Sequence, residues 1–115
     1  MESIMKISET TSGDVRIISI AGRLDANSYL ALESHLNQLI QSGEKKLLID
    51  FKQMAYLSST GLSTLIQGAQ KMNAARGKMV FCCVDEKFID VFEVSGLKQY
   101  FVLFPTQEAG LKAFS

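Results

Sequence analysis

Apolar residues along this chain of 115 residues follow two alternating patterns. Strand-like segments rich in apolar and β-branched residues lie at 5–9, 15–20, 46–51, 78–84 and 100–104. Between them, apolar residues recur at helical spacing and form two stripes: Tyr29, Leu32, Leu36, Leu39 and Ile40 in the first, and Leu62, Leu65, Ala69 and Met72 in the second. The pattern therefore predicts strands separated by amphipathic helices.

The order of these segments predicts an α/β fold. Gly13 and Asp14 form a short turn between the first two strands, which favours an antiparallel hairpin. Strands and helices alternate after the hairpin, so crossover connections and a mostly parallel sheet are expected. A short third helix follows Asp85, and a last helix begins after Thr106 as its N-cap. We expect a single domain over residues 1–115, with a central mixed, mostly parallel sheet of about five strands and about four helices.

Composition narrows the classes of partner. The hydrophobic share of 47% is too high for a disordered polymer. Twelve basic and 12 acidic residues give a net charge of zero, and no basic run suggests binding to nucleic acid. No apolar run reaches membrane-spanning length, so we expect a cytoplasmic protein without membrane insertion.

The two cysteines are adjacent, at Cys82 and Cys83. Neighbouring residues in a strand point to opposite faces, so these side chains are expected to share neither a metal ion nor a disulfide. The pattern predicts two buried structural thiols. Because no group of His, Cys and carboxylate residues has metal-ligand spacing, neither a metal site nor a cofactor is predicted.

Candidate chemistry lies in two loops that follow strands, Asp25-Ala26-Asn27 and Ser58-Ser59-Thr60. Sites in α/β sheets form at the carboxyl ends of strands. The three hydroxyls precede a helix, so they either cap its free N–H groups or include a phosphorylation site held by those groups. A catalytic serine would need a base, and His35, the only histidine, is expected on a solvated helix flank. No enzymatic activity is therefore predicted.

The apolar residues just before the second helix are ambiguous. Met54, Tyr56 and Leu57 are expected in a surface loop, where Met54 and Tyr56 could contact a partner. Leu57 could instead pack against Leu62 and fix the entry of the helix.

Within that helix, Gly68 lies near the apolar stripe, where a missing side chain permits close approach to a sheet.

Three blocks of sequence together resemble the STAS domain family, and within it the anti-sigma factor antagonists. They are Gly22-Arg23-Leu24-Asp25, Leu48-Ile49-Asp50-Phe51 and Tyr56-Leu57-Ser58-Ser59-Thr60-Gly61-Leu62, and the ending Phe104-Pro105-Thr106 also fits. The resemblance implies a mixed sheet with helices mainly on one side. It also implies a partner-switching regulator that binds an anti-sigma factor/serine kinase when unphosphorylated, leaves it when phosphorylated, and is restored by a PP2C-type phosphatase.

The same resemblance assigns candidate residues. Ser59 aligns with the phosphorylated serine, and Ser58 and Thr60 remain further candidate acceptors. A partner is expected to contact the two loops and the residues before the second helix: Asp25, Asn27, Met54, Tyr56, Ser58, Thr60 and Gly61. A homodimer is left open.

This sequence departs from the family pattern at two positions. Ser58 stands where many antagonists carry Asp, and Ser63 stands where a second Gly is frequent. The missing Asp favours an alternative function, a STAS scaffold subunit that is not phosphorylated, for example in a lipid-transport ABC complex.

Overall fold

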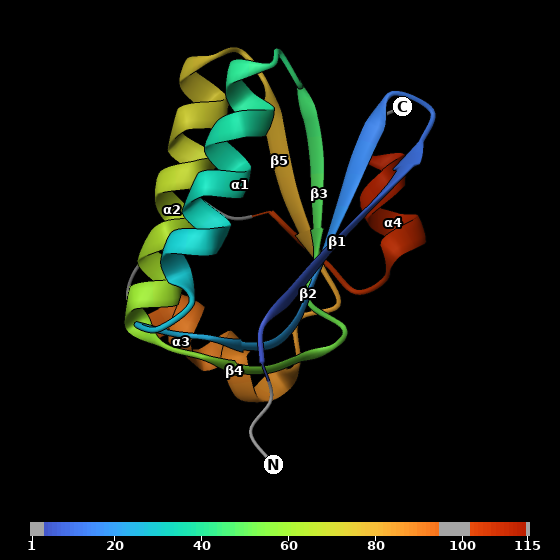
Figure 1. Cartoon of the computed structure of the whole chain (residues 1–115). Helices are drawn as coiled ribbons and strands as arrows, with labels where there is room; N and C mark the ends of the chain where they lie inside the picture. Colours follow the sequence, from blue (N-terminus) through green and yellow to red (C-terminus); the bar gives the residue numbers. More distant parts are fainter. Residues whose placement is uncertain (1–3, 95–101, 115) are drawn as a thin grey trace.

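The computed structural model describes residues 4–94 and 102–114, without the side chains of residues 91–94. Strands and helices alternate along most of the chain, as the apolar pattern predicts (Figure 1). The elements are β1 (Lys6–Ser12), β2 (Val15–Leu24), α1 (Tyr29–Gln41), β3 (Lys46–Asp50), β4 (Met54–Leu57), α2 (Ser59–Ala74), β5 (Lys78–Cys82), α3 (Glu86–Val94), β6 (Leu103–Phe104) and α4 (Gln107–Lys112).

The strands form one mixed sheet in the order β1-β2-β3-β5-β6. Strand β1 is antiparallel to β2, and the β2–β3, β3–β5 and β5–β6 pairs are parallel. The predicted fold class and opening hairpin are thus confirmed. A further strand, β4, pairs in parallel with the end of β2 and brings the sheet to six strands.

Strand β4 was expected to be a surface loop, and that expectation is wrong. Its four residues pair with the last part of β2 after an irregularity in register between Gly22 and Arg23. Gly22 has a φ of +85°, and a Cβ there would lie 2.4 Å from the carbonyl oxygen of Ile4. Glycine at this position therefore lets β2 bend and continue to Leu24, four residues beyond the predicted 15–20 segment.

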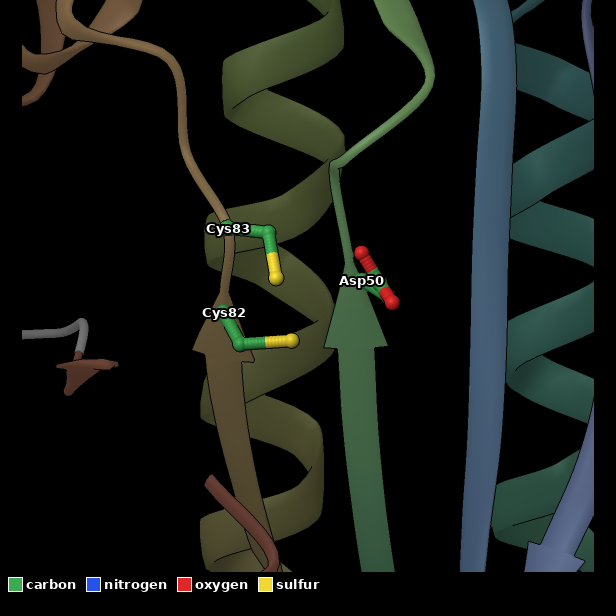
Figure 2. Close-up of side chains that lie close together, drawn as sticks. All are labelled: Asp50, Cys82 and Cys83. Atoms are coloured by element: carbon green, nitrogen blue, oxygen red, sulfur yellow. The ribbon is translucent and has the colours of Figure 1, made fainter. Parts of the chain in front are cut away.

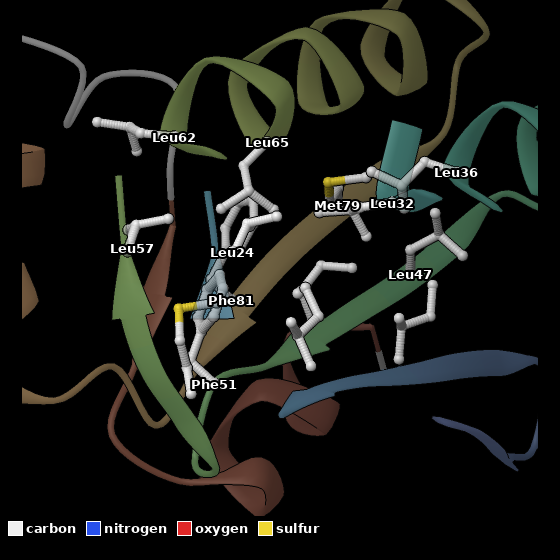
Figure 3. Close-up of a cluster of buried hydrophobic side chains, with 14 of the residues drawn as sticks. Leu24, Leu32, Leu36, Leu47, Phe51, Leu57, Leu62, Leu65, Met79 and Phe81 are labelled. Atoms are coloured by element: carbon white, nitrogen blue, oxygen red, sulfur yellow. The ribbon is translucent and has the colours of Figure 1, made fainter. Parts of the chain in front are cut away.

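Helices cover both faces of the sheet. Helices α1 and α2 lie on one side and α4 on the other (Figure 1). The larger core lies between the sheet and the α1–α2 pair, where both predicted stripes contribute buried leucines (Figure 3). Phe51 and Phe81 stack there with ring centroids 5.7 Å apart. Burying each such side chain contributes about 1.5–3 kcal/mol, so this layer holds the carboxyl ends of the strands in place.

The smaller core lies beneath α4 and contains Leu48, Val80 and Cys82. Gly110 is buried at this contact, and a Cβ there would lie 2.8 Å from a methyl group of Leu48. Helix α4 begins as predicted, because the Thr106 hydroxyl accepts a hydrogen bond from the N–H of Ala109 at 3.1 Å.

Other predicted boundaries changed. Helix α2 begins at Ser59 rather than at residue 62. The last strand covers residues 103–104 and leaves out Val102, and residues 100–101 of the predicted strand lie outside the described residues. In α3, Phe88 is buried, and the side chains of Val91 and Phe92 are not described. Gly68 packs against Leu36 of α1 as well as near Met79 of the sheet. No helix in the described part of the chain has the length and apolarity needed to cross a membrane.

Candidate functional site

The two candidate loops lie next to each other at the carboxyl edge of the sheet. Strand pairing places Leu24 opposite Leu57, and the N–H of Ser58 donates to the carbonyl oxygen of Leu24 at 3.0 Å. Asp25 and Ser59 therefore follow directly from two neighbouring strand ends. The prediction that these loops meet at one edge is confirmed, although the strand that carries the second loop is β4.

The first loop is held by Asp25. Its Oδ1 accepts the N–H of Asn27 at 3.0 Å, and its own N–H donates to Oγ of Ser28 at 3.0 Å. Ser28 occupies the N-cap position of α1, but its hydroxyl donates to the carbonyl oxygen of Arg23 at 2.8 Å instead of capping the helix. Asp25 thus fixes an Asx turn, while Asn27 keeps an exposed side chain.

Arg23 and Leu30 lie beside this loop, and sequence reasoning did not select either as a site residue. The guanidinium carbon of Arg23 lies 4.3 Å from the centre of the Tyr56 ring, and Nε lies 3.4 Å from Oδ2 of Asp25. Leu30, in the first turn of α1, is 61% exposed although it is a large apolar side chain. The sequence did contain a signal for Leu30. This residue lies outside the inward-facing stripe of α1, and an apolar residue there has no core to enter.

The three hydroxyls of the second loop have different environments. Oγ of Ser58 accepts the N–H of Gly61 at 3.1 Å, so Ser58 is the N-cap of α2. Thr60 is half-buried, and its carbonyl oxygen accepts the hydroxyl of Thr64 at 3.1 Å. Ser59, the first residue of the helix, is exposed, and its hydroxyl forms no hydrogen bond with any described residue. Ser59 is therefore the one exposed residue of the triplet.

A shallow polar groove of about 420 Å³ runs between the first turns of α1 and α2. Its wall from α1 includes one carboxylate, and its wall from α2 carries hydroxyls and an amide. The lining residues are Tyr29, Glu33, Ser59, Thr60, Ser63, Thr64 and Gln67. The groove gives a partner access to Ser59 from the side of α1.

Two residues of the predicted contact set are not at the surface. Met54 is only 6% exposed, since it lies in β4 and packs in the larger core. Gly61 is buried, and a Cβ there would lie 2.7 Å from both Cγ and the carbonyl oxygen of Leu24. The expectation that Met54 lies in a surface loop is therefore wrong. Leu57 is buried in the same core as Leu62, which agrees with the packing alternative, whereas Tyr56 is 41% exposed.

His35 was expected to be solvated, but it is half-buried. Its Nε2 pairs with the carboxylate of Glu9 on β1. Glu9 also accepts a hydrogen bond from Arg16 at 3.1 Å. These contacts place His35 of α1 beside the Glu9–Arg16 ion pair of the opening hairpin.

The structure overturns the geometric argument about the cysteines. Cys83 lies one residue beyond β5 and has a φ of +64°, so strand alternation does not apply to it. Both sulfur atoms are directed toward β3, where Asp50 lies (Figure 2). Burial is the main cause that raises the pKa of each thiol above its usual range. Cys82 is fully buried, as predicted, whereas Cys83 is half-buried.

Comparisons with known proteins agree on one family. The STAS domain model matches residues 6–110. BtrV of Bordetella bronchiseptica, provisionally named an anti-sigma factor antagonist, is 26% identical over 110 residues, covering 96% of this chain and 95% of BtrV. The crystal structure of an anti-sigma factor antagonist from Mycobacterium paratuberculosis superposes with a TM-score of 0.86 at 23% identity, covering 96% and 93% of the two chains. The phosphorylated form of SpoIIAA from Bacillus superposes with a TM-score of 0.74 at 16% identity, covering 97% and 100%.

Proposed function

The chain belongs to the STAS domain family, and we propose that it is an anti-sigma factor antagonist that switches partners through Ser59. Unphosphorylated, it binds an anti-sigma factor that also acts as its serine kinase. Phosphorylation of Ser59 releases the partner, and a PP2C-type phosphatase restores binding. The observation that carries the proposal is the division of roles between Ser58, which caps α2, and Ser59, which is exposed.

The start of α2 suits a phosphate on Ser59. No described residue accepts a hydrogen bond from the N–H of Ser59 or of Thr60, and the first turn of α2 contains no acidic residue. Free N–H groups and the positive end of the helix dipole favour an anion at this position. The Bacillus protein SpoIIAA, whose structure is that of a phosphorylated form, supports the same chemistry in a protein of this fold.

Ser58 is compatible with this role even though many antagonists carry Asp there. Its hydroxyl provides the cap that a carboxylate would provide, so α2 still begins at Ser59. Because Ser58 is neutral, a phosphate on Ser59 would have no charged side chain directly before it in the sequence. Compared with an Asp at this position, Ser58 removes one source of charge repulsion with the phosphate. It also removes one acidic feature that a kinase could recognise.

We propose that the partner docks over the carboxyl edge around Ser59. Leu30 and Tyr56 supply exposed apolar area, and Asp25, Asn27 and Thr60 supply polar groups around it. A phosphate adds about two negative charges. A docked partner would have to desolvate those charges, so phosphorylation would disfavour the complex without a change of fold. Such a complex would form in the cytoplasm.

Partner binding by charge variants tests the proposal. The anti-sigma factor/kinase is isolated by its retention on the immobilised wild-type chain in the absence of ATP. Its affinity is then measured for wild type, Ser59→Ala, Ser59→Asp and a matched control, Gln70→Asp, which places the same charge on exposed surface of α2 outside the groove. We expect Ser59→Asp to bind at least about tenfold more weakly, and Gln70→Asp to stay within about threefold of wild type.

Mass spectrometry after incubation with the kinase and ATP gives the second readout. We expect the phosphate on Ser59 and none on the Ser59→Ala chain. Phosphate on Ser58 or Thr60 in wild type would move the switch to another hydroxyl. Equal binding by all variants, together with co-purification of a transporter ATPase subunit, would instead support the constitutive scaffold function that the missing Asp favours.

A further inference from the structure

Asp50, Cys82 and Cys83 bring three metal-ligating atoms together on the face of the sheet that α4 covers. Asp50 and Cys82 are paired in register between β3 and β5, so their side chains lie side by side. Cys83 joins them because its positive φ turns its sulfur back toward β3 (Figure 2). Within the described part of the chain, the carboxylate oxygen and the two sulfur atoms all lie within 4.8 Å of one another.

The backbone fixes both cysteines. The N–H of Phe51 donates to the carbonyl oxygen of Cys82 at 3.0 Å, and the N–H of Cys83 donates to the carbonyl oxygen of Phe104 at 3.0 Å. These bonds tie the end of β5 to the strands on both sides of it. The two sulfur atoms are therefore held by the sheet and do not depend on a free loop for their positions.

Hydrogen bonds within the protein hold the carboxylate of Asp50 in one orientation. Only 7% of its surface is exposed, and among the described residues no basic side chain forms an ion pair with it. Its Oδ1 accepts the N–H of Lys52 at 2.8 Å, and its Oδ2 accepts Nε2 of Gln107 at 3.0 Å. These two neutral donors fix the orientation of the carboxylate, and ligating carboxylates in metal sites are typically held by such hydrogen bonds.

Solvent reaches this cluster through a pocket of about 450 Å³. Its lining comes from the ends of β3 and β5 and the start of α4: Asp50, Lys52, Cys83, Pro105, Thr106 and Gln107. An ion could reach Asp50 and Cys83 through this opening, and a water molecule or other small ligand could complete its coordination from the same side. The cluster thus combines three convergent ligands with a route to solvent.

We propose that Asp50, Cys82 and Cys83 bind a thiophilic divalent metal ion of the Zn²⁺ type, with one coordination position open to the pocket. Zinc takes thiolate and carboxylate ligands with tetrahedral geometry, and a Zn–S bond of about 2.3 Å places two ligating sulfurs roughly 3.8 Å apart. Small rotations of the two thiols would bring the cluster to that spacing. Binding replaces one proton on each thiol by the metal ion and releases both protons to solvent. The site lies on the α4 face and does not involve Ser59.

Titration of the reduced full-length protein with Co²⁺, and then with Zn²⁺ in competition, tests the site. We expect one metal ion per chain, with a thiolate-to-cobalt charge-transfer absorption that Zn²⁺ abolishes. Cys83→Ser should lose much of that absorption, and Asp50→Asn should weaken binding at least about tenfold. Asp90→Asn, which removes an exposed carboxylate outside the cluster, is the matched control and should bind as wild type does.

Protection from alkylation provides a readout that needs no variant at the fully buried Cys82. We expect Zn²⁺ to slow the reaction of Cys83 with iodoacetamide in the wild-type chain, and not in the Asp50→Asn chain. The proposal is overturned if the charge-transfer band does not form, if Cys83→Ser binds Co²⁺ as wild type does, or if one ion requires two chains. It is also overturned if Zn²⁺ leaves the alkylation rate unchanged.

Discussion

Helices α2 and α4 begin in the same way at the same edge of the sheet. Each has a hydroxyl N-cap, Ser58 or Thr106, which accepts a backbone N–H three residues later at 3.1 Å. The next residue differs in its environment. Ser59 faces solvent beside the α1–α2 groove, whereas Gln107 turns its amide toward the buried carboxylate of Asp50.

The difference shows that a capping pattern does not decide the role of a helix start. Both patterns are clear in the sequence, but the side chain after the cap depends on which face of the sheet the helix covers. Helix α2 packs on the larger core and keeps its first residue outside, whereas α4 closes over the strand ends and its first residue completes their hydrogen bonding. We therefore expect α2 to serve a partner and α4 to hold the Asp50 pocket.

The largest expected loss of stability comes from adding a methyl group at the closely packed glycine beneath each helix. Gly61→Ala would place a Cβ 2.7 Å from backbone oxygen of Leu24, which cannot move aside, so we expect a loss of about 3 kcal/mol in unfolding free energy. In Gly110→Ala the nearest atom is a methyl group of Leu48, which can rotate, and we expect a loss of about 1 kcal/mol or less. Urea unfolding of both variants measures the contrast. Equal losses would mean that α2 is no more tightly seated on the backbone than α4.

Gln107→Leu tests the inward role of the first residue of α4. Because it removes a hydrogen bond to a buried carboxylate, we expect a loss of about 2 kcal/mol in unfolding free energy. Gln67→Leu, on the exposed surface of α2, is the matched control and should change stability by less than about 0.5 kcal/mol. The loss at Gln107 should shrink when Asp50→Asn is also present. Additive losses would show that the two residues do not interact.

Apolar periodicity predicted the sheet, the opening hairpin and both long helices, because each is fixed by residues that must be buried. It missed β4, since Met54–Leu57 is too short to show alternation and pairs with a bent continuation of β2 that only Gly22 permits. It also misplaced Cys83, because a single positive φ at a strand end reverses the expected direction of a side chain. The hydroxyl triplet was located correctly, but its division into cap and free serine depends on the helix starting at Ser59, three residues earlier than the apolar pattern indicated.

Removing each cap should have a moderate and similar effect on the two helices. Ser58→Ala and Thr106→Ala each leave one backbone N–H without its acceptor, so we expect each to cost about 1 kcal/mol in unfolding free energy. Ser58→Asp keeps an acceptor at the cap and should retain wild-type stability within about 0.5 kcal/mol. Thermal and urea unfolding measure all three variants. A loss of about 1 kcal/mol in Ser58→Asp would mean that this start of α2 does not accommodate the acidic residue of its relatives.

Ser59→Ala should have the smallest effect on stability of the variants considered. The Ser59 hydroxyl is exposed and bonds no described residue, so its removal should change the unfolding free energy by less than about 0.5 kcal/mol. A matched change at Ser63, also exposed on α2, should give the same result. If Ser59→Ala instead costs as much as Ser58→Ala, both hydroxyls support the helix start. Any loss of partner binding in Ser59 variants could then reflect a distorted edge of the sheet. The assignment of the helix cap to Ser58 and of the switch to Ser59 would then be wrong.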